Sequence, residues 1–143
     1  MSLWIALVVL GAGTGIAFQM PMTALVAQRV GLAQSLLVVN SVGLVSVALV
    51  LVCRGTPMLE GWRTIPPWAL VAGPLGMGAM AALAFAIPRI GIAPTLVLSI
   101  AAQLIVGLLL DWLGFLASEV RTLDLPRLAG AVLLALGAWL VAR

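Results

Sequence analysis

The chain has 143 residues, of which 64% are hydrophobic and only 8% are charged, and its formal net charge is +3 at pH 7. A soluble domain of this length must cover its core with polar side chains, so this composition excludes a soluble protein. The single cysteine and the lack of histidine exclude an intrachain disulfide and the usual metal sites. We therefore expect a membrane protein without a metal or cofactor.

Apolar segments of spanning length follow one another along the chain. A membrane helix needs about 20 apolar residues. Lipid offers the backbone no hydrogen-bond partner, and these segments lack the alternating pattern of barrel strands, so we predict helices. The expected fold is one all-α transmembrane domain, residues 1–143, with spans at 3–26, 33–52, 68–87, 93–110 and 128–142.

The first span contains a polar group next to a proline. Inside a helix, Pro21 donates no backbone hydrogen bond and displaces the carbonyl of Ala17. Discontinuous helices with freed carbonyls recur at transporter binding sites. Gln19 and Thr23 flank this proline, and we interpret them as candidate substrate-binding residues.

A polar turn at Gln28–Arg29 separates the first two spans in this interpretation. Gln19 and Asn40 lie at similar distances from the turn, so they should meet at similar depth in the hairpin. A structural hydrogen bond between helices, worth about 0.6 kcal/mol, and a substrate-facing role both remain open.

The third span should stop at Pro88–Gly91. In the fourth span Gln103, Gly107 and Asp111 follow at four-residue steps and form a slowly winding stripe. Gln103 is a candidate substrate contact. Asp111 is either a proton or cation site or a structural ion pair, with Arg127 at the start of the fifth span among its candidate partners.

Small residues in several spans indicate close packing of helices, the main association force in lipid. The candidate packing positions are Gly11, Gly15, Gly107 and Gly130.

The arginines give little orientation signal. If five spans alternate, Arg54, Arg63, Arg121 and Arg127 lie on the face of the N-terminus, and Arg29, Arg89 and Arg143 lie on the other. Orientation follows the Lys/Arg difference between short loops. This near balance leaves two alternatives: a weakly cytoplasmic N-terminus, or insertion in both directions with an antiparallel dimer.

The segment around the fourth span resembles a known family. In AAQLIVGLLLDWLG, Gln103, Leu104, Gly107, Asp111 and Gly114 match the pattern of the small five-helix, YdcZ-type branch of the drug/metabolite transporter superfamily. Ala102 replaces the glycine of that pattern.

Matches outside this segment are Arg127, Gly130, Gly137 and Gln19, whereas Thr23 stands where asparagine is usual and Asn40–Ser41 replaces a Ser-Phe pair. The resemblance implies a transporter that is half of a ten-span, inverted-repeat plan.

No catalytic constellation is present, so we do not expect an enzyme, and the scattered arginines form no nucleic-acid surface. We predict a multi-pass exporter of a small molecule in the bacterial inner membrane. Its partners would be the lipid bilayer and either a second copy, in parallel or antiparallel orientation, or a homologous half. The alternatives are a small channel and a non-transporting scaffold.

Overall fold

The structure, a computed structural model, describes residues 3–57, 61–114 and 124–143. In these ranges it contains helices and turns but no strand. The helices are α1 (Leu3–Val30), α2 (Leu32–Cys53), η1 (Trp62–Thr64), η2 (Pro67–Val71), α3 (Ala72–Ile90), α4 (Ile92–Leu113) and α5 (Leu125–Ala142). The predicted all-α membrane bundle of five long helices is confirmed.

The helices have the lengths that a bilayer demands. Four segments of 22 to 28 residues are long and apolar enough to cross a membrane: Leu3–Val30, Leu32–Cys53, Pro67–Ile90 and Ile92–Leu113. The apolar helix Leu128–Val141 is shorter than these four.

Large apolar side chains cover the outside of these helices, and few are buried. The buried apolar residues are Met20, Ala24, Leu36, Ala84, Ile87 and Ala138. In water such an exterior would be unstable, whereas hydrocarbon solvates it. The fold therefore needs lipid around it.

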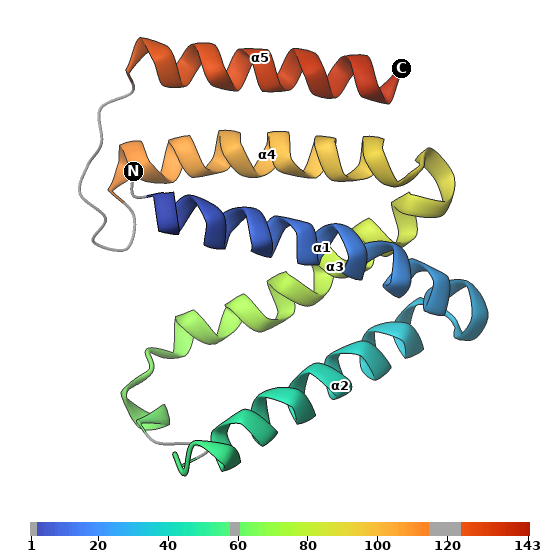
Figure 1. The fold of residues 1–143 in the computed structure, drawn as a ribbon, viewed down its shortest axis with the longest axis vertical. Helices are drawn as coiled ribbons and strands as arrows, with labels where there is room; N and C mark the ends of the chain where they lie inside the picture. Colours follow the sequence, from blue (N-terminus) through green and yellow to red (C-terminus); the bar gives the residue numbers. More distant parts are fainter. Residues whose placement is uncertain (1–2, 58–60, 115–123) are drawn as a thin grey trace. The chain divides into compact units, whose positions relative to one another are not determined.

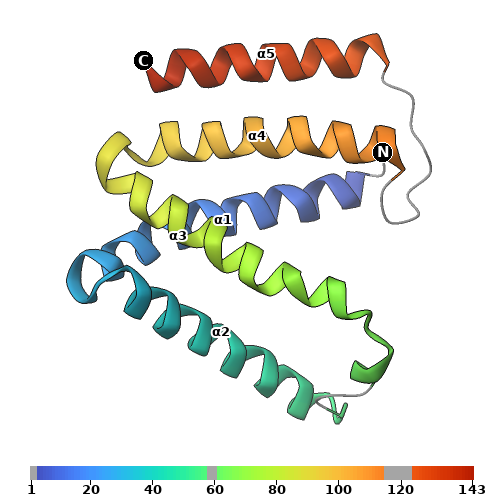
Figure 2. The same cartoon turned by 180° about the vertical axis from the view of Figure 1, so that it is seen from behind.

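Contacts divide the chain into two compact units, Met1–Pro88 and Arg89–Arg143. In the first unit α1 packs against α2, and in the second α4 packs against α5. Each of these pairs is an antiparallel hairpin in both views (Figures 1 and 2). The single domain over residues 1–143 stays a prediction.

Gly31 makes the turn of the first hairpin. Its φ of 95° and ψ of 157° belong to a region that side chains avoid. Its N–H donates to the carbonyl of Ala27 (2.9 Å), and its own carbonyl accepts from the N–H of Ser35 (3.0 Å). One residue therefore ends α1 and starts α2.

The predicted turn at Gln28–Arg29 is wrong, because both residues belong to the last turn of α1. A helix of 28 residues is about 42 Å long, which exceeds the roughly 30 Å of hydrocarbon. Its polar end can therefore reach the headgroups without leaving the helix.

The turn between α3 and α4 repeats this solution. Gly91 has φ 92° and ψ 165°, and Pro88 lies inside the last turn of α3 rather than ending it. The sequences Arg-Val-Gly-Leu-Ala-Gln-Ser-Leu and Arg-Ile-Gly-Ile-Ala-Pro-Thr-Leu match around these glycines. Similar sequence thus produces the same turn twice.

We expect Gly31→Ala to destabilise the protein by about 1–3 kcal/mol, because alanine is strained at this φ and ψ. Gly43→Ala is the matched control: the position is helical, and an added Cβ meets nothing within 4 Å. It should be neutral or slightly stabilising. Unfolding in mixed micelles by added SDS, followed by tryptophan fluorescence, measures both. Equal midpoints for the two variants would contradict this role of Gly31.

Candidate functional site

A groove of about 420 Å³ lies between α1 and α2. Two of its lining residues, Gln19 and Thr23, are polar, and both were predicted from the sequence. The others are Gly15, Phe18, Met22, Val26, Val38, Val39 and Val42. The groove therefore combines an apolar wall with one amide and one hydroxyl.

Two buried hydroxyl groups fix the helices beside this groove. Thr23 is 1% exposed, and its Oγ1 donates to the backbone carbonyl of Gln19 (3.0 Å). Ser35 on α2 is fully buried, and its Oγ donates to the carbonyl of Thr23 (2.9 Å). In lipid a hydroxyl must find a partner, and these two find backbone oxygens next to Pro21. The Ser35 hydroxyl thus joins α2 to α1 close to the proline, whereas the Thr23 hydroxyl bonds within α1.

Ser35 is a residue that the sequence analysis missed. It stands four positions after Gly31, as Thr95 stands four positions after Gly91. Thr95 is also buried, at 3% exposure, and its Oγ1 donates to the Gly91 carbonyl (2.7 Å). The recurrence of a hydroxyl after a turn glycine is the signal that could have found both.

The Gln19 side chain has a different environment. It lines the groove and is exposed, and its amide has no hydrogen-bond partner among the described residues. An amide offers two donors and one acceptor oxygen. Leaving such a group unpaired within a membrane span is costly. A polar group of another molecule would therefore gain more binding free energy from a hydrogen bond to Gln19 than from any other position in this groove.

The structure does not bring Asn40 to Gln19. The Nδ2 of Asn40 donates to the carbonyl of Leu36 (2.8 Å) and lies 4.0 Å from the Sδ of Met80 on α3. Asn40 is not among the residues that line the α1–α2 groove. From its distance to the turn, Asn40 is expected at a depth similar to that of Gln19, but its side chain faces α3.

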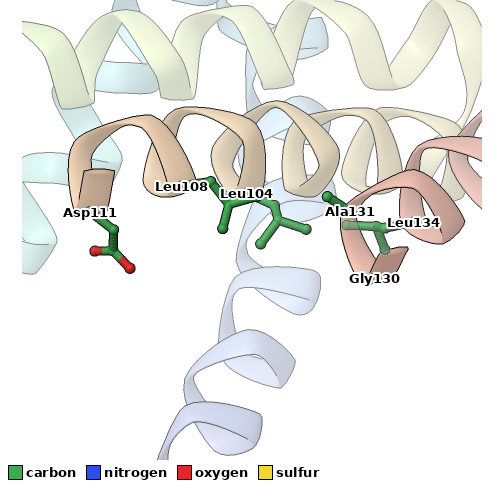
Figure 3. Close-up of a pocket in the computed structure, with 6 residues that line it drawn as sticks. All are labelled: Leu104, Leu108, Asp111, Gly130, Ala131 and Leu134. Atoms are coloured by element: carbon green, nitrogen blue, oxygen red, sulfur yellow. The ribbon is translucent and has the colours of Figure 1, made fainter. Parts of the chain in front are cut away.

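A second groove, of about 450 Å³, lies between α4 and α5. Leu104, Leu108, Asp111, Gly130, Ala131 and Leu134 line it (Figure 3). Asp111 is the polar residue of this set, and its carboxylate lies beyond the two leucines of α4. A carboxylate next to an apolar wall can carry a proton or attract a cation.

The predicted partner Arg127 belongs to the first turn of α5, but its side chain lies outside those that the structure describes. The ion pair with Asp111 stays a prediction.

Gln103 does not share the groove of Asp111. Its Nε2 donates to the Oγ of Ser99 (2.8 Å) one turn earlier in α4, and the side chain is exposed. Asp111 lies eight residues after Gln103, which is a net rotation of about 80° around the helix axis. It lies seven residues after Leu104, which is a net rotation of only about 20°. Gln103 and Asp111, the two ends of the predicted stripe, therefore face different directions around α4.

The glycines predicted to pack helices make no close contacts among the described residues. At Gly11, Gly15, Gly107 and Gly130 an added Cβ would meet nothing within 4 Å. That these glycines pack helices together, here against a helix of another molecule, stays a prediction. In the described ranges no group of three or more His, Cys, Asp or Glu could hold a metal ion.

Comparisons with known proteins agree on one family. The model of a family described as "Putative inner membrane exporter, YdcZ" matches residues 3–140. A curated relative, inner membrane protein YdcZ of Escherichia coli (strain K12), is 41% identical over 76 residues. That match covers 53% of this chain and 50% of the relative, so it spans about half the length of each. No solved structure matches.

The resemblance expected from the fourth span is thereby confirmed. Several helices of spanning length, together with these two matches, indicate a multi-pass protein of the bacterial inner membrane. Because the family model matches residues 3–140 of 143, this chain belongs to the YdcZ family, within the drug/metabolite transporter superfamily.

Proposed function

We propose that this chain is a secondary transporter that exports a small molecule, and that Gln19 contacts the substrate in the α1–α2 groove. One observation carries the proposal: an amide without a partner faces an apolar groove in a membrane-spanning helix. Thr23 supports the site by bonding the backbone of Gln19. A water-filled channel would need polar residues across the bilayer, and this groove has only these two.

Gln103 is the second candidate substrate contact in this proposal. Its bond to Ser99 uses one donor, so the second N–H and the carbonyl oxygen of its amide can still bind a ligand. It lies on α4 and is exposed, which suits a residue that completes a pathway with another molecule. Asn40 is the weaker candidate, since its amide already reaches Leu36 and Met80.

The working unit in this proposal is a homodimer of oppositely oriented copies. Two features support it. The arginines are nearly balanced between the two faces, so insertion in either direction is permitted. Exposed glycines such as Gly11 and Gly15 leave room for a helix of a second copy to approach closely. Antiparallel pairing would place two equivalent grooves on the two sides of the membrane.

Ion coupling through Asp111 completes the proposal. The carboxylate lies at the end of α4 beside an apolar groove, where a proton can be exchanged with the membrane surface. Release of that proton can drive return of the transporter to its starting state.

Gln19→Leu should lower the rate of substrate movement about threefold to tenfold, which is the effect of losing one neutral hydrogen bond. Leucine keeps the size of the side chain and removes its amide. Purified protein in liposomes is tested by counterflow with a panel of radiolabelled small molecules. Gln28→Leu, on the same helix but outside the groove, should leave the rate unchanged. Loss of assembly in Gln19→Leu, with no saturable flux in the wild type, would instead favour a scaffold.

Asp111→Asn should abolish the acceleration of flux by a pH gradient while preserving counterflow, because asparagine cannot carry the proton. Asp124→Asn is the control, since Asp124 precedes α5 and asparagine caps a helix equally well. Flux is measured with and without an imposed gradient. A normal response to the gradient in Asp111→Asn would exclude coupling through this residue.

Antiparallel insertion predicts that each face of the protein is found on both sides of the membrane. The test places Thr64→Cys, an exposed residue of η1, in a Cys53→Ala background. An impermeant maleimide should label about half of the copies in intact spheroplasts, and the rest only after permeabilisation. Labelling of every copy from one side would rule out the antiparallel dimer.

A further inference from the structure

We propose that the α1–α2 groove binds an uncharged, mostly apolar molecule through a single neutral hydrogen-bonding group, such as an amide, which pairs with Gln19. This inference rests on the proposed function, since it names the class of substrate for the same groove. It commits the groove to a small-molecule ligand rather than to a lipid chain or a second copy of α1.

The groove has no charged side chain, which argues that its ligand is uncharged. None of its lining residues is ionisable. An ion that leaves water for such a site loses its hydration and meets no opposite charge. An organic cation or a carboxylate would therefore bind here poorly, whatever the fit of its apolar part.

The hydrogen-bonding capacity of the groove carries the second step. The Oγ1 hydrogen of Thr23 is used by the backbone carbonyl of Gln19 (3.0 Å), so the free donors belong to the Gln19 amide. That amide also offers an acceptor oxygen. A primary amide on the ligand can donate to this oxygen and accept from the N–H₂ group, which satisfies both molecules without a charge.

The shape of the wall carries the third step. The cavity of about 420 Å³ falls in the range of small-molecule sites, and its remaining surface is apolar. Phe18 and Met22 line it from α1, and Val38 and Val42 line it from α2. A short aliphatic or aromatic body can lie between these residues while its polar end reaches Gln19.

The second groove gives a contrast within the same chain. It has a similar volume, about 450 Å³, and a similar apolar wall, but it includes the carboxylate of Asp111. The two grooves therefore differ in charge, because only the second is lined by an ionisable residue.

Three probes with the same chain length separate these cases: hexanamide, hexylammonium and hexanoate. The full chain is reconstituted in lipid nanodiscs, and saturable binding of each radiolabelled probe is measured at pH 7 against empty nanodiscs. We expect saturable binding of hexanamide, weakened about threefold to tenfold by Gln19→Leu and unchanged by Gln28→Leu. Thermal unfolding of each variant without a probe checks that it is folded.

Two results would overturn the inference, and they differ in what else they affect. Gln19-dependent binding of hexylammonium or hexanoate in place of hexanamide would refute the neutral class and leave the groove as the substrate site. If Gln19→Leu is folded and weakens the binding of none of the three probes, a lipid chain or a second copy fills the groove. That result would also remove Gln19 from the proposed transport pathway.

Discussion

The scarcity of hydrogen-bond partners in hydrocarbon is the constraint on which this structure depends. Each backbone N–H and carbonyl must be satisfied within a helix, and each polar side chain must find a partner nearby. Thr14, Thr23 and Ser46 bond the carbonyl four residues earlier in their own helices, at 2.8 to 3.0 Å. In the described ranges no buried side-chain nitrogen or oxygen lacks a partner. Gln19 differs from these residues, because its exposed amide lines an open groove and has no such hydrogen bond.

The same constraint explains why the two tight turns are built alike. A connection of one residue leaves little backbone exposed between two helices, provided that the residue can adopt a positive φ. Gly31 and Gly91 provide it, and Ser35 and Thr95 bury their hydroxyls one turn later. Ser35 bonds across to α1, whereas Thr95 bonds back to its own turn. The repeated motif therefore makes a common turn, and the partner of its hydroxyl differs with the neighbouring helix.

Hydropathy predicted the helices well because burial in lipid acts on whole segments. Depth in the membrane follows from distance along the helix, and Gln19 and Asn40 lie 12 and 9 residues from Gly31. Hydropathy could not predict which way a side chain faces. Asn40 turns to Met80 on α3, and Gln103 bonds to Ser99 and does not line the groove of Asp111. These helices are apolar on all sides. The sequence therefore has no amphipathic pattern from which the rotation of each helix about its own axis could be predicted.

The position of the hydroxyl pair decides where the first hairpin is closed. Met20, Ala24 and Leu36 are buried together with Ser35 near the Gly31 turn, and farther along the two helices separate (Figure 1). The bond from Ser35 to the Thr23 carbonyl keeps the turn end shut, while Gln19 lies one helical turn farther from it. In the proposed transport cycle, this bond would close the turn end of the hairpin to a ligand held by Gln19. Its exit on that side would need other surfaces, so the proposed exporter would require a further wall beside this hairpin to move a substrate across the bilayer.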